Sequence, residues 1–243
     1  MADLVTKSIG LRTMSTSDLS VIYITANVLP RRFARKTQEQ LLKAIGGLPL
    51  VSVSKKPMDF GENICVGNTP RSQANIYRQA LIGAKAATTR YMAIAEDDVL
   101  YSPEHFKYRP PPRTFAYGVN NWNVFTWGTP MFTLKSPLGR KNLNALICER
   151  KLFVEAIEER FRLWPDDSKI SSSTFGEPGR YDKHLGTTPY PVEGFYINPP
   201  NIVFYHQTAL SFKGLGTRKR PGQVRATEIS YWGRAEDTIK LYV

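Results

Sequence analysis

The sequence has little cysteine, no long apolar run and a shortage of acidic side chains. Its 243 residues include 2 cysteines, Cys65 and Cys148, too few for a disulfide framework and without the spacing of a metal site. No apolar stretch approaches the ~20 residues that cross a bilayer. The first twenty residues lack the apolar core of a signal peptide. We therefore expect a cytoplasmic protein with no membrane span.

The shortage of acids leaves a strong positive charge. Lys and Arg number 33 against 21 Asp and Glu, so the formal net charge is +12. Such an excess favours a polyanionic partner, namely nucleic acid, an anionic membrane surface or a phosphorylated small molecule. The alternative is a basic protein that binds no polyanion. The length suits one domain of the larger α/β kind, and nothing in the sequence predicts a protein partner.

One stretch, residues 91–101, dominates the chain. It reads Tyr-Met-Ala-Ile-Ala-Glu-Asp-Asp-Val-Leu-Tyr, so an apolar run leads directly into Glu96, Asp97 and Asp98. A short continuous apolar run is typical of a strand buried on both faces in a parallel sheet. Three carboxylates at its end would repel one another unless a cation lay among them. The stretch predicts a Mg²⁺ or Mn²⁺ site, and an acidic turn in contact with water is the alternative.

The segments before and after this stretch predict an α/β protein. Strands and helices alternate before it, which implies a parallel sheet with crossover helices. After it the sequence becomes rich in aromatic residues, proline and loops. The predicted elements are strand 19–28, helix 31–45, strand 50–54, a Gly/Asn-rich loop 61–70, helix 71–87, short and partly antiparallel strands within 102–136, helix 147–163, a loop region 164–194 and strand 203–206.

His206 ends the last of these strands, as the carboxylates end theirs. A neutral imidazole beside carboxylates suits Mn²⁺, so His206 is a candidate metal ligand. The alternative is a core histidine with its hydrogen bonds satisfied.

Together these features resemble a GT-A glycosyltransferase. The resemblance is carried by the first strand ending in Thr25 and Asn27, by the Gly/Asn loop and the helix after it, and by the acidic triplet at residues 96–98. It implies a Rossmann-like fold with a mostly parallel central sheet flanked by helices and a mixed acceptor-side half. The implied organisation is a loose lead-in over 1–18 and a single domain over 19–243. That domain divides into a nucleotide-sugar half (19–101), an acceptor half (102–212) and a basic C-terminal tail (213–243).

The resemblance also implies roles for individual residues. A nucleotide-diphosphate sugar, expected to be a UDP-sugar, would lie over the strand ends with Mn²⁺ or Mg²⁺ against its diphosphate. The implied metal ligands are Asp98, Glu96 and His206, and the implied nucleotide-sugar contacts are Thr25, Asn27, Ser54, Asn75, Arg78, Asp97 and Lys213. The family often places an acid after the second strand, where this chain has Ser54 and Lys55, so the base of the nucleotide stays open.

An inverting enzyme of this kind also needs a general base for the acceptor hydroxyl. Asp182 is the first candidate, because it is expected to begin a short helix, and Glu177 in the preceding turn is the second. Either acid could instead cap a helix or pair with Arg180. A retaining enzyme would need no such base.

The acceptor is predicted from charge and aromatic residues. Basic residues cluster at 31–36, 107–113 and 213–225, and the chain is similar to phage-type transferases that decorate hydroxymethylated pyrimidines in DNA. We expect Arg218, Lys219 and Arg220 to contact phosphates, and Tyr117, Trp122 or Trp127 to stack on a base. The predicted acceptor is therefore 5-hydroxymethylcytosine in DNA, within the host cytoplasm. The alternatives are a transferase of surface polysaccharide or glycolipid synthesis and a non-enzymatic nucleic-acid-binding module.

Overall fold

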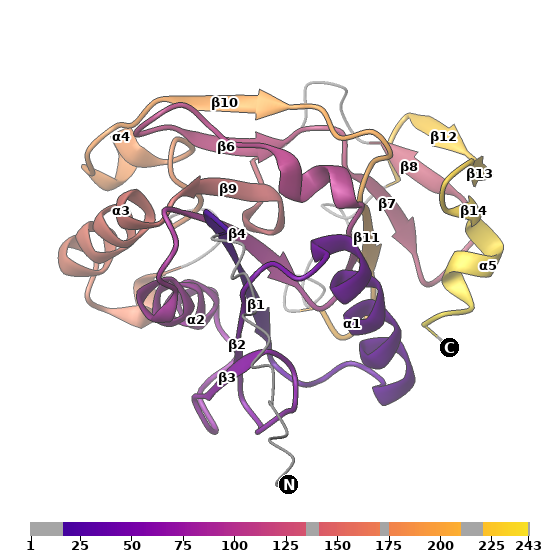
Figure 1. The fold of residues 1–243 in the computed structure, drawn as a ribbon, viewed down its shortest axis with the longest axis horizontal. Helices are drawn as coiled ribbons and strands as arrows, with labels where there is room; N and C mark the ends of the chain where they lie inside the picture. Colours follow the sequence, from indigo (N-terminus) through magenta and orange to yellow (C-terminus); the bar gives the residue numbers. More distant parts are fainter. Residues whose placement is uncertain (1–16, 135–140, 171–174, 210–220, 243) are drawn as a thin grey trace, which may run out of the picture.

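A seven-stranded sheet forms the centre of the computed structural model, which describes residues 17–134, 141–170, 175–209 and 221–242 (Figure 1). In spatial order its strands are β10 (Val192–Phe195), β6 (Phe115–Gly118), β9 (Leu146–Glu149), β4 (Tyr91–Glu96), β1 (Leu19–Thr25), β2 (Leu50–Ser54) and β3 (Glu62–Cys65). All neighbouring pairs are parallel except those that β9 makes with β4 and β6. The predicted mostly parallel sheet is confirmed.

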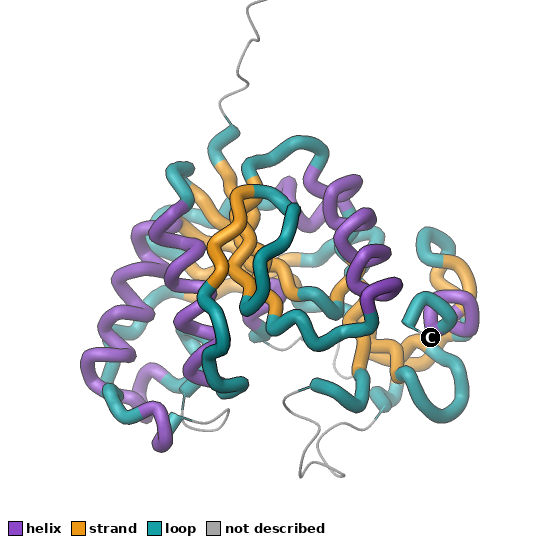
Figure 2. The backbone as a smooth tube through the Cα atoms, turned by 90° about the horizontal axis from the view of Figure 1, so that it is seen from below, coloured by secondary structure: helices purple, strands orange, loops and turns teal. Residues whose placement is uncertain are grey.

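Helices cover both faces of this sheet because its strands are apolar on both sides. Side chains alternate along a strand. In β1, Ile22 and Ile24 pack toward α2 (Gln73–Ala86) and α3 (Arg150–Leu163), whereas Val21 and Tyr23 pack toward α1 (Arg31–Ile45). Figures 1 and 2 show the strands lying between these two groups of helices.

A second, mixed sheet lies beside α1. Its strands in spatial order are β12 (Val224–Ala226), β8 (Phe132–Leu134), β7 (Trp122–Phe125), β11 (Ile202–Tyr205) and β5 (Val99–Leu100). Phe33 of α1 packs edge-on against Phe204 of β11 and joins α1 to this sheet. The remaining elements are β13 (Glu228–Ile229), β14 (Gly233–Arg234), α4 (Asp182–Leu185), α5 (Ala235–Ile239) and the 3₁₀ helices η1 (Pro103–Lys107), η2 (Leu143–Ala145) and η3 (Asp167–Lys169).

The predicted α/β fold class, with a mixed second half, is confirmed. The helix at 31–45 and the strand at 50–54 form as predicted, while the first strand ends at Thr25 because Asn27 adopts a positive φ of 53°. Ser72 caps α2 by accepting a hydrogen bond from the backbone N–H of Asn75. Within the described residues no helix is both long and apolar enough to cross a membrane.

Two predicted assignments are corrected, and the C-terminal segment, for which no elements were predicted, contains several. The helix predicted over 147–163 begins at Arg150, since the apolar residues before it form β9, buried between β4 and β6. The predicted loop 61–70 contains β3, a polar edge strand without the alternation that marks a buried strand. The described part of the basic tail, 221–242, folds into β12, β13, β14 and α5.

Candidate functional site

The polar residues singled out in the sequence gather at one edge of the central sheet. Parallel strands end at the same edge, and the register pairs Thr25 with Ser54 and places Glu96 opposite Ile24. In open α/β sheets, ligands bind outside these carboxyl ends. This edge is therefore the candidate site.

The three consecutive acids at the end of β4 do not point in one direction. Glu96 points toward η2, where Asn144 Nδ2 lies 3.3 Å from its Oε2. Asp97 points toward β1 and accepts a hydrogen bond from the hydroxyl of Thr25. Asp98 lies in the turn after the strand and faces His206. β4 ends at Glu96, so Asp97 and Asp98 both lie in the turn after it, and each of the three acids has a different partner.

Asp98, in the turn between β4 of the central sheet and β5 of the second, meets His206, which follows β11. Oδ2 of Asp98 lies 3.3 Å from Nε2 of His206, and the backbone N–H of Phe204 donates to the carbonyl of Asp98 at 2.8 Å. The side chain of Asp98 is 19% exposed and that of His206 is 5% exposed. Oδ1 of Asp98 is buried and accepts no hydrogen bond from any described residue. A buried carboxylate oxygen left in this state is a place where a cation would be stabilised.

The electrostatics of the site are those of an uncompensated acidic cluster. Burial, followed by the charges of Asp98 and Asp97, raises the pKa of Glu96 well above its ordinary value. Burial and the charge of Asp98 raise the pKa of Asp97 to about 7. Over the described part of the chain, no three His, Cys, Asp or Glu side chains converge as metal ligands. The structure thus pairs Asp98 with His206 and does not bring Glu96 into the same group.

The predicted nucleotide contacts divide into two groups. Thr25, Asn27 and Ser54 lie at the candidate edge, where the side chain of Asn27 accepts from the backbone N–H groups of Lys55 (2.8 Å) and Lys56 (3.0 Å). These contacts join the ends of β1 and β2.

Two further predicted contacts, Asn75 and Arg78, come from α2. Asn75 is buried and donates to Gln79, which in turn donates to the carbonyls of Thr25 and Val53 at the strand ends. Arg78, by contrast, is exposed and forms an ion pair with Asp167 at 2.6 Å, on the side of α2 that faces η3. Lys213 lies outside the described residues.

Two cations at this edge, Lys55 and Arg71, are not among the residues predicted to form the site. Lys55, directly after β2, donates to the carbonyl of Thr69, and Arg71 donates to the carbonyl of Thr208 at 2.6 Å. Burial and the nearby charge of Arg71 lower the pKa of Lys55. The ion pairs found among the described residues give neither cation a carboxylate partner. Both residues flank the Gly/Asn-rich segment, which is the signal that could have identified them.

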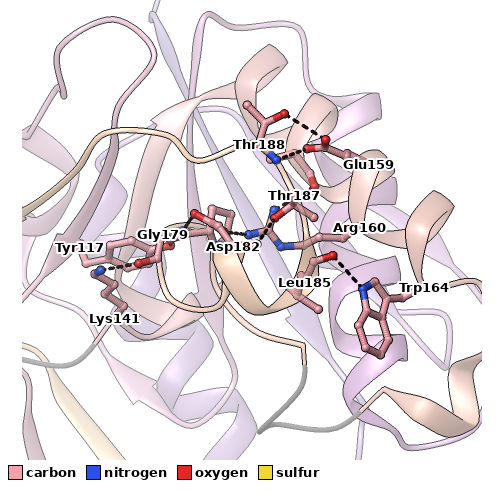
Figure 3. A network of polar contacts seen from close by, with 12 residues as sticks. Tyr117, Lys141, Glu159, Arg160, Trp164, Gly179, Asp182, Leu185, Thr187 and Thr188 are labelled. Carbon is pink, nitrogen blue, oxygen red and sulfur yellow. Dashed lines mark hydrogen bonds and ion pairs between the residues drawn. The ribbon is translucent and has the colours of Figure 1, made fainter.

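The two candidate bases occupy different environments, and Figure 3 shows that of Asp182. Asp182 begins α4 as predicted, but its carboxylate is buried against the fully buried guanidinium of Arg160 and accepts from the backbone N–H of Gly179 at 2.7 Å. Tyr117 and Lys141 donate to the carbonyls of Pro178 and Gly179, respectively. The turn holds both acids, and these contacts attach it to α3 and to the central sheet.

Glu177 lies in the same turn, near enough to Glu96 for its charge to act on that residue. Its carboxylate pairs with Arg180 at 3.0 Å. The pKa of Tyr77 is raised first by burial and then by the charge of Glu177. Glu177 also contributes to the raised pKa of Glu96, after burial, Asp98 and Asp97. Glu177, rather than Asp182, therefore shares the electrostatic environment of the acidic strand end.

The residues predicted to contact DNA are only partly placed. Tyr117 is 1% exposed, so it is a core residue and does not present a ring for stacking. Trp122 and Trp127 are half-buried, and Trp127 packs edge-on against Phe125 with ring centroids 5.2 Å apart. Arg218, Lys219 and Arg220 lie outside the described residues.

Comparison with known proteins finds no matching family model and no matching curated protein. Among solved structures, the mannosyltransferase PcManGT from Pyrobaculum calidifontis in complex with GDP-Man and Mn²⁺ is similar, with 13% identity and a TM-score of 0.43 over 77% of this chain and 56% of that one. The bifunctional IspDF from Campylobacter jejuni has 11% identity and a TM-score of 0.40, over 74% and 50%. S. aureus TarS 1-349 in complex with UDP-GlcNAc has 12% identity and a TM-score of 0.36, over 57% and 47%. The chain spans about half the length of these three proteins, and likenesses at these scores do not identify an activity.

Proposed function

We propose that this chain is a metal-dependent glycosyltransferase whose donor is a nucleotide-diphosphate sugar, with a UDP-sugar as the expected donor. One observation carries the proposal. Asp98 and His206 meet at the carboxyl edge of a parallel sheet, and Oδ1 of Asp98 is buried without a hydrogen bond from any described residue. Together they offer a carboxylate oxygen and an imidazole nitrogen to a cation.

This pair of ligands fits Mn²⁺, and Mg²⁺ would accept the same carboxylate. Asp98 and His206 would hold the ion, and the positions that remain suit phosphate oxygens and water. When bound, such an ion neutralises the charge that develops on a diphosphate leaving group. Glu96, the third ligand predicted from the sequence, stays a prediction that only a bound state can test.

Lys55 and Arg71 support a donor that carries phosphate. Both cations lie at the candidate edge, and the described residues offer them backbone carbonyls as partners rather than carboxylates. Two neighbouring cations repel each other, and a diphosphate between them would relieve that repulsion. Hydrogen bonds from cations to phosphate oxygens are also among the stronger ones in proteins.

For the acceptor hydroxyl we propose Glu177 as the general base, ahead of Asp182. Asp182 is committed to Arg160 inside the protein, and moving it would leave a buried guanidinium without its partner. Glu177 has one partner in the described structure, Arg180, whose guanidinium is 31% exposed. Glu177 acts in this way if transfer inverts the anomeric configuration. A retaining transfer would not use it.

DNA containing 5-hydroxymethylcytosine remains the acceptor that we propose. The net charge of +12 supports a polyanion. In addition, α1 starts with exposed Arg31 and Arg32 and has no acid in its first turn. Positive charge at a helix N-terminus is unfavourable by ~0.3–1 kcal/mol per residue, so this arrangement suggests that the cations serve a partner rather than the helix.

A transfer assay tests the proposal. The protein would be incubated with Mn²⁺, a panel of nucleotide sugars and either hydroxymethylcytosine DNA or unmodified DNA, and the nucleosides would be weighed by mass spectrometry. We expect a sugar-sized mass gain confined to the hydroxymethylated DNA. Asp98→Asn should abolish it, and Asp59→Asn, a change at an exposed acid, should not.

The same assay separates the alternatives. Donor hydrolysis that requires Mn²⁺ and Asp98 but produces no modified DNA would keep the transferase and favour a polysaccharide or glycolipid acceptor. DNA binding without any response to Mn²⁺ or nucleotide sugars would favour the non-enzymatic binding module.

A further inference from the structure

The imidazole of His206 is held on three sides. Its Nε2 lies 3.3 Å from Oδ2 of Asp98, and its Nδ1 lies 2.8 Å from the hydroxyl of Thr208. The ring of Tyr242 lies against one face, with centroids 5.7 Å apart and an interplanar angle of 30°. The orientation of the ring therefore depends on Thr208 as well as on Asp98.

The chemistry of a hydroxyl suits this position. A metal bound at Nε2 requires the imidazole proton on Nδ1, and a partner at Nδ1 that accepts this proton selects that tautomer. Without a metal, Nε2–H would face Asp98, and Nδ1 would then need a donor. A threonine hydroxyl can both donate and accept, so Thr208 can partner His206 in either tautomer.

Thr208 is itself held by Arg71, one of the two cations proposed to bind the phosphates of the sugar donor. The guanidinium of Arg71 donates to its backbone carbonyl at 2.6 Å, across 137 positions of sequence. Arg71 is also close enough to Lys55 to lower the pKa of that lysine, after burial. Contacts thus run from Arg71, through Thr208, to His206 and Asp98.

We propose that Thr208 is a positioning residue for the metal ligand His206, and that Arg71 holds Thr208 in place. This inference rests on the proposed function, because it requires a metal ion at Asp98 and His206. It adds a residue outside the ligand set and links the metal site to the cations proposed to bind phosphate.

Calorimetric titration of Mn²⁺ into the full chain tests the proposal without an activity assay. Thr208→Val keeps the shape of the side chain and removes the hydroxyl, and Thr208→Ser restores the hydroxyl. Thr208 is exposed, so neither change should unfold the protein. Loss of a partner behind a metal-bound histidine weakens metal binding by about 10- to 100-fold. We expect a loss of that size for Thr208→Val, an affinity close to wild type for Thr208→Ser, and an intermediate loss for Arg71→Gln.

NMR of the ring nitrogens of His206 provides a second measurement and reports the tautomer directly. The chain has 3 histidines, so the ring nitrogens of His206 can be assigned by NMR. In the metal-free wild type we expect the proton on Nε2, facing Asp98. Thr208→Val should leave the proton on Nε2 and change the chemical shift of Nδ1, which loses its hydrogen-bond donor; a general loss of packing would not act selectively at that nitrogen.

The possible failures are distinguishable. If Asp98→Asn abolishes Mn²⁺ binding but Thr208→Val binds as tightly as wild type, this inference is overturned and the proposed metal site stands. If the wild type itself binds no Mn²⁺ under any of these conditions, the proposed metal site fails and the inference fails with it. Unchanged Mn²⁺ affinity in Arg71→Gln would overturn the role of Arg71 alone.

Discussion

Nε2 of His206 lies 3.3 Å from Oδ2 of Asp98, although 108 positions of sequence separate the two residues. The carboxylate follows the central strand β4, and the imidazole follows β11 of the second sheet. The backbone N–H of Phe204 donates to the carbonyl of Asp98 at 2.8 Å and continues the antiparallel pairing of β11 with β5, so Asp98 lies where the chain passes from the central sheet into the second. The candidate site therefore forms only when both sheets are assembled.

The first prediction concerns Lys55, one of the two cations proposed to bind the phosphates of the sugar donor. Lys55→Gln should weaken the binding of a nucleoside diphosphate by about tenfold or more, because a charge-assisted hydrogen bond contributes ~1.5–3 kcal/mol. Lys56→Gln, which changes the exposed neighbouring lysine, is the matched control. Calorimetry at low salt measures both. Equal losses in the two variants would indicate general charge attraction rather than a phosphate site.

The second prediction separates the two candidate bases. Glu177→Gln should lower kcat by about 10²- to 10⁴-fold, the usual contribution of a general base, and leave the melting temperature close to wild type. Asp182→Asn should instead destabilise the protein by ~3–5 kcal/mol, because it leaves the buried guanidinium of Arg160 uncompensated. Steady-state kinetics and urea unfolding on both variants measure this difference. The opposite pattern would return the role of base to Asp182.

The third prediction concerns His105, a buried imidazole of η1 outside the site. Burial lowers its pKa from an ordinary 6.5 to about 3. Between these values the unfolded chain binds a proton that the folded chain does not, so stability is full above pH 6.5 and falls as the pH drops toward 3. The loss is ~1.4 kcal/mol per pH unit.

Urea unfolding of wild type and His105→Gln at pH 7.5 and pH 5 measures this contribution. The unfolding free energy of wild type minus that of His105→Gln should be about 2 kcal/mol smaller at pH 5 than at pH 7.5. His184→Gln is the control, because His184 is exposed. A difference for His105→Gln that does not change with pH would show that the imidazole titrates alike in both states.

The fourth prediction concerns Gly83, where α2 crosses the central sheet. Alanine in a helix is ordinarily ~1 kcal/mol better than glycine. Here a β-carbon would lie 2.3 Å from Cγ2 of Ile22 and 3.1 Å from Cγ2 of Val53, and overpacking of this kind costs ~1–3 kcal/mol. We expect Gly83→Ala to lower the melting temperature. In the double variant with Ile22→Ala, the two losses should be less than additive.

The comparison of sequence with structure shows where local patterns suffice. Continuous apolar runs and cap residues predicted β1, α1, β2 and α2 to within a few residues, because burial on both faces leaves a clear signal. The sequence pattern did not predict the antiparallel strand β9, since its short apolar run continues directly into α3. Periodicity alone does not separate such a run from a helix.

The candidate site was predictable in part, for a related reason. A strand end with three acids predicts an acidic edge, but the direction of each acid is set by a partner that is distant in sequence. The contact between Arg71 and Thr208 spans 137 positions, and no local pattern indicates it. The burial of Tyr117, likewise, follows from its place in β6, between β10 and β9 of the central sheet, and not from its aromatic neighbours.

The central claim is that Asp98 and His206 hold a divalent ion that carries the diphosphate of the donor. Its most direct test is calorimetric titration of UDP, GDP and CDP into wild type and Asp98→Asn, each with Mn²⁺ and with a chelator. We predict that at least one diphosphate binds the wild type about tenfold or more tightly with Mn²⁺, since a metal ion contributes several kcal/mol. That advantage should vanish in Asp98→Asn. Diphosphate binding that is indifferent to Mn²⁺, or a Mn²⁺ effect that Asp98→Asn retains, would contradict it.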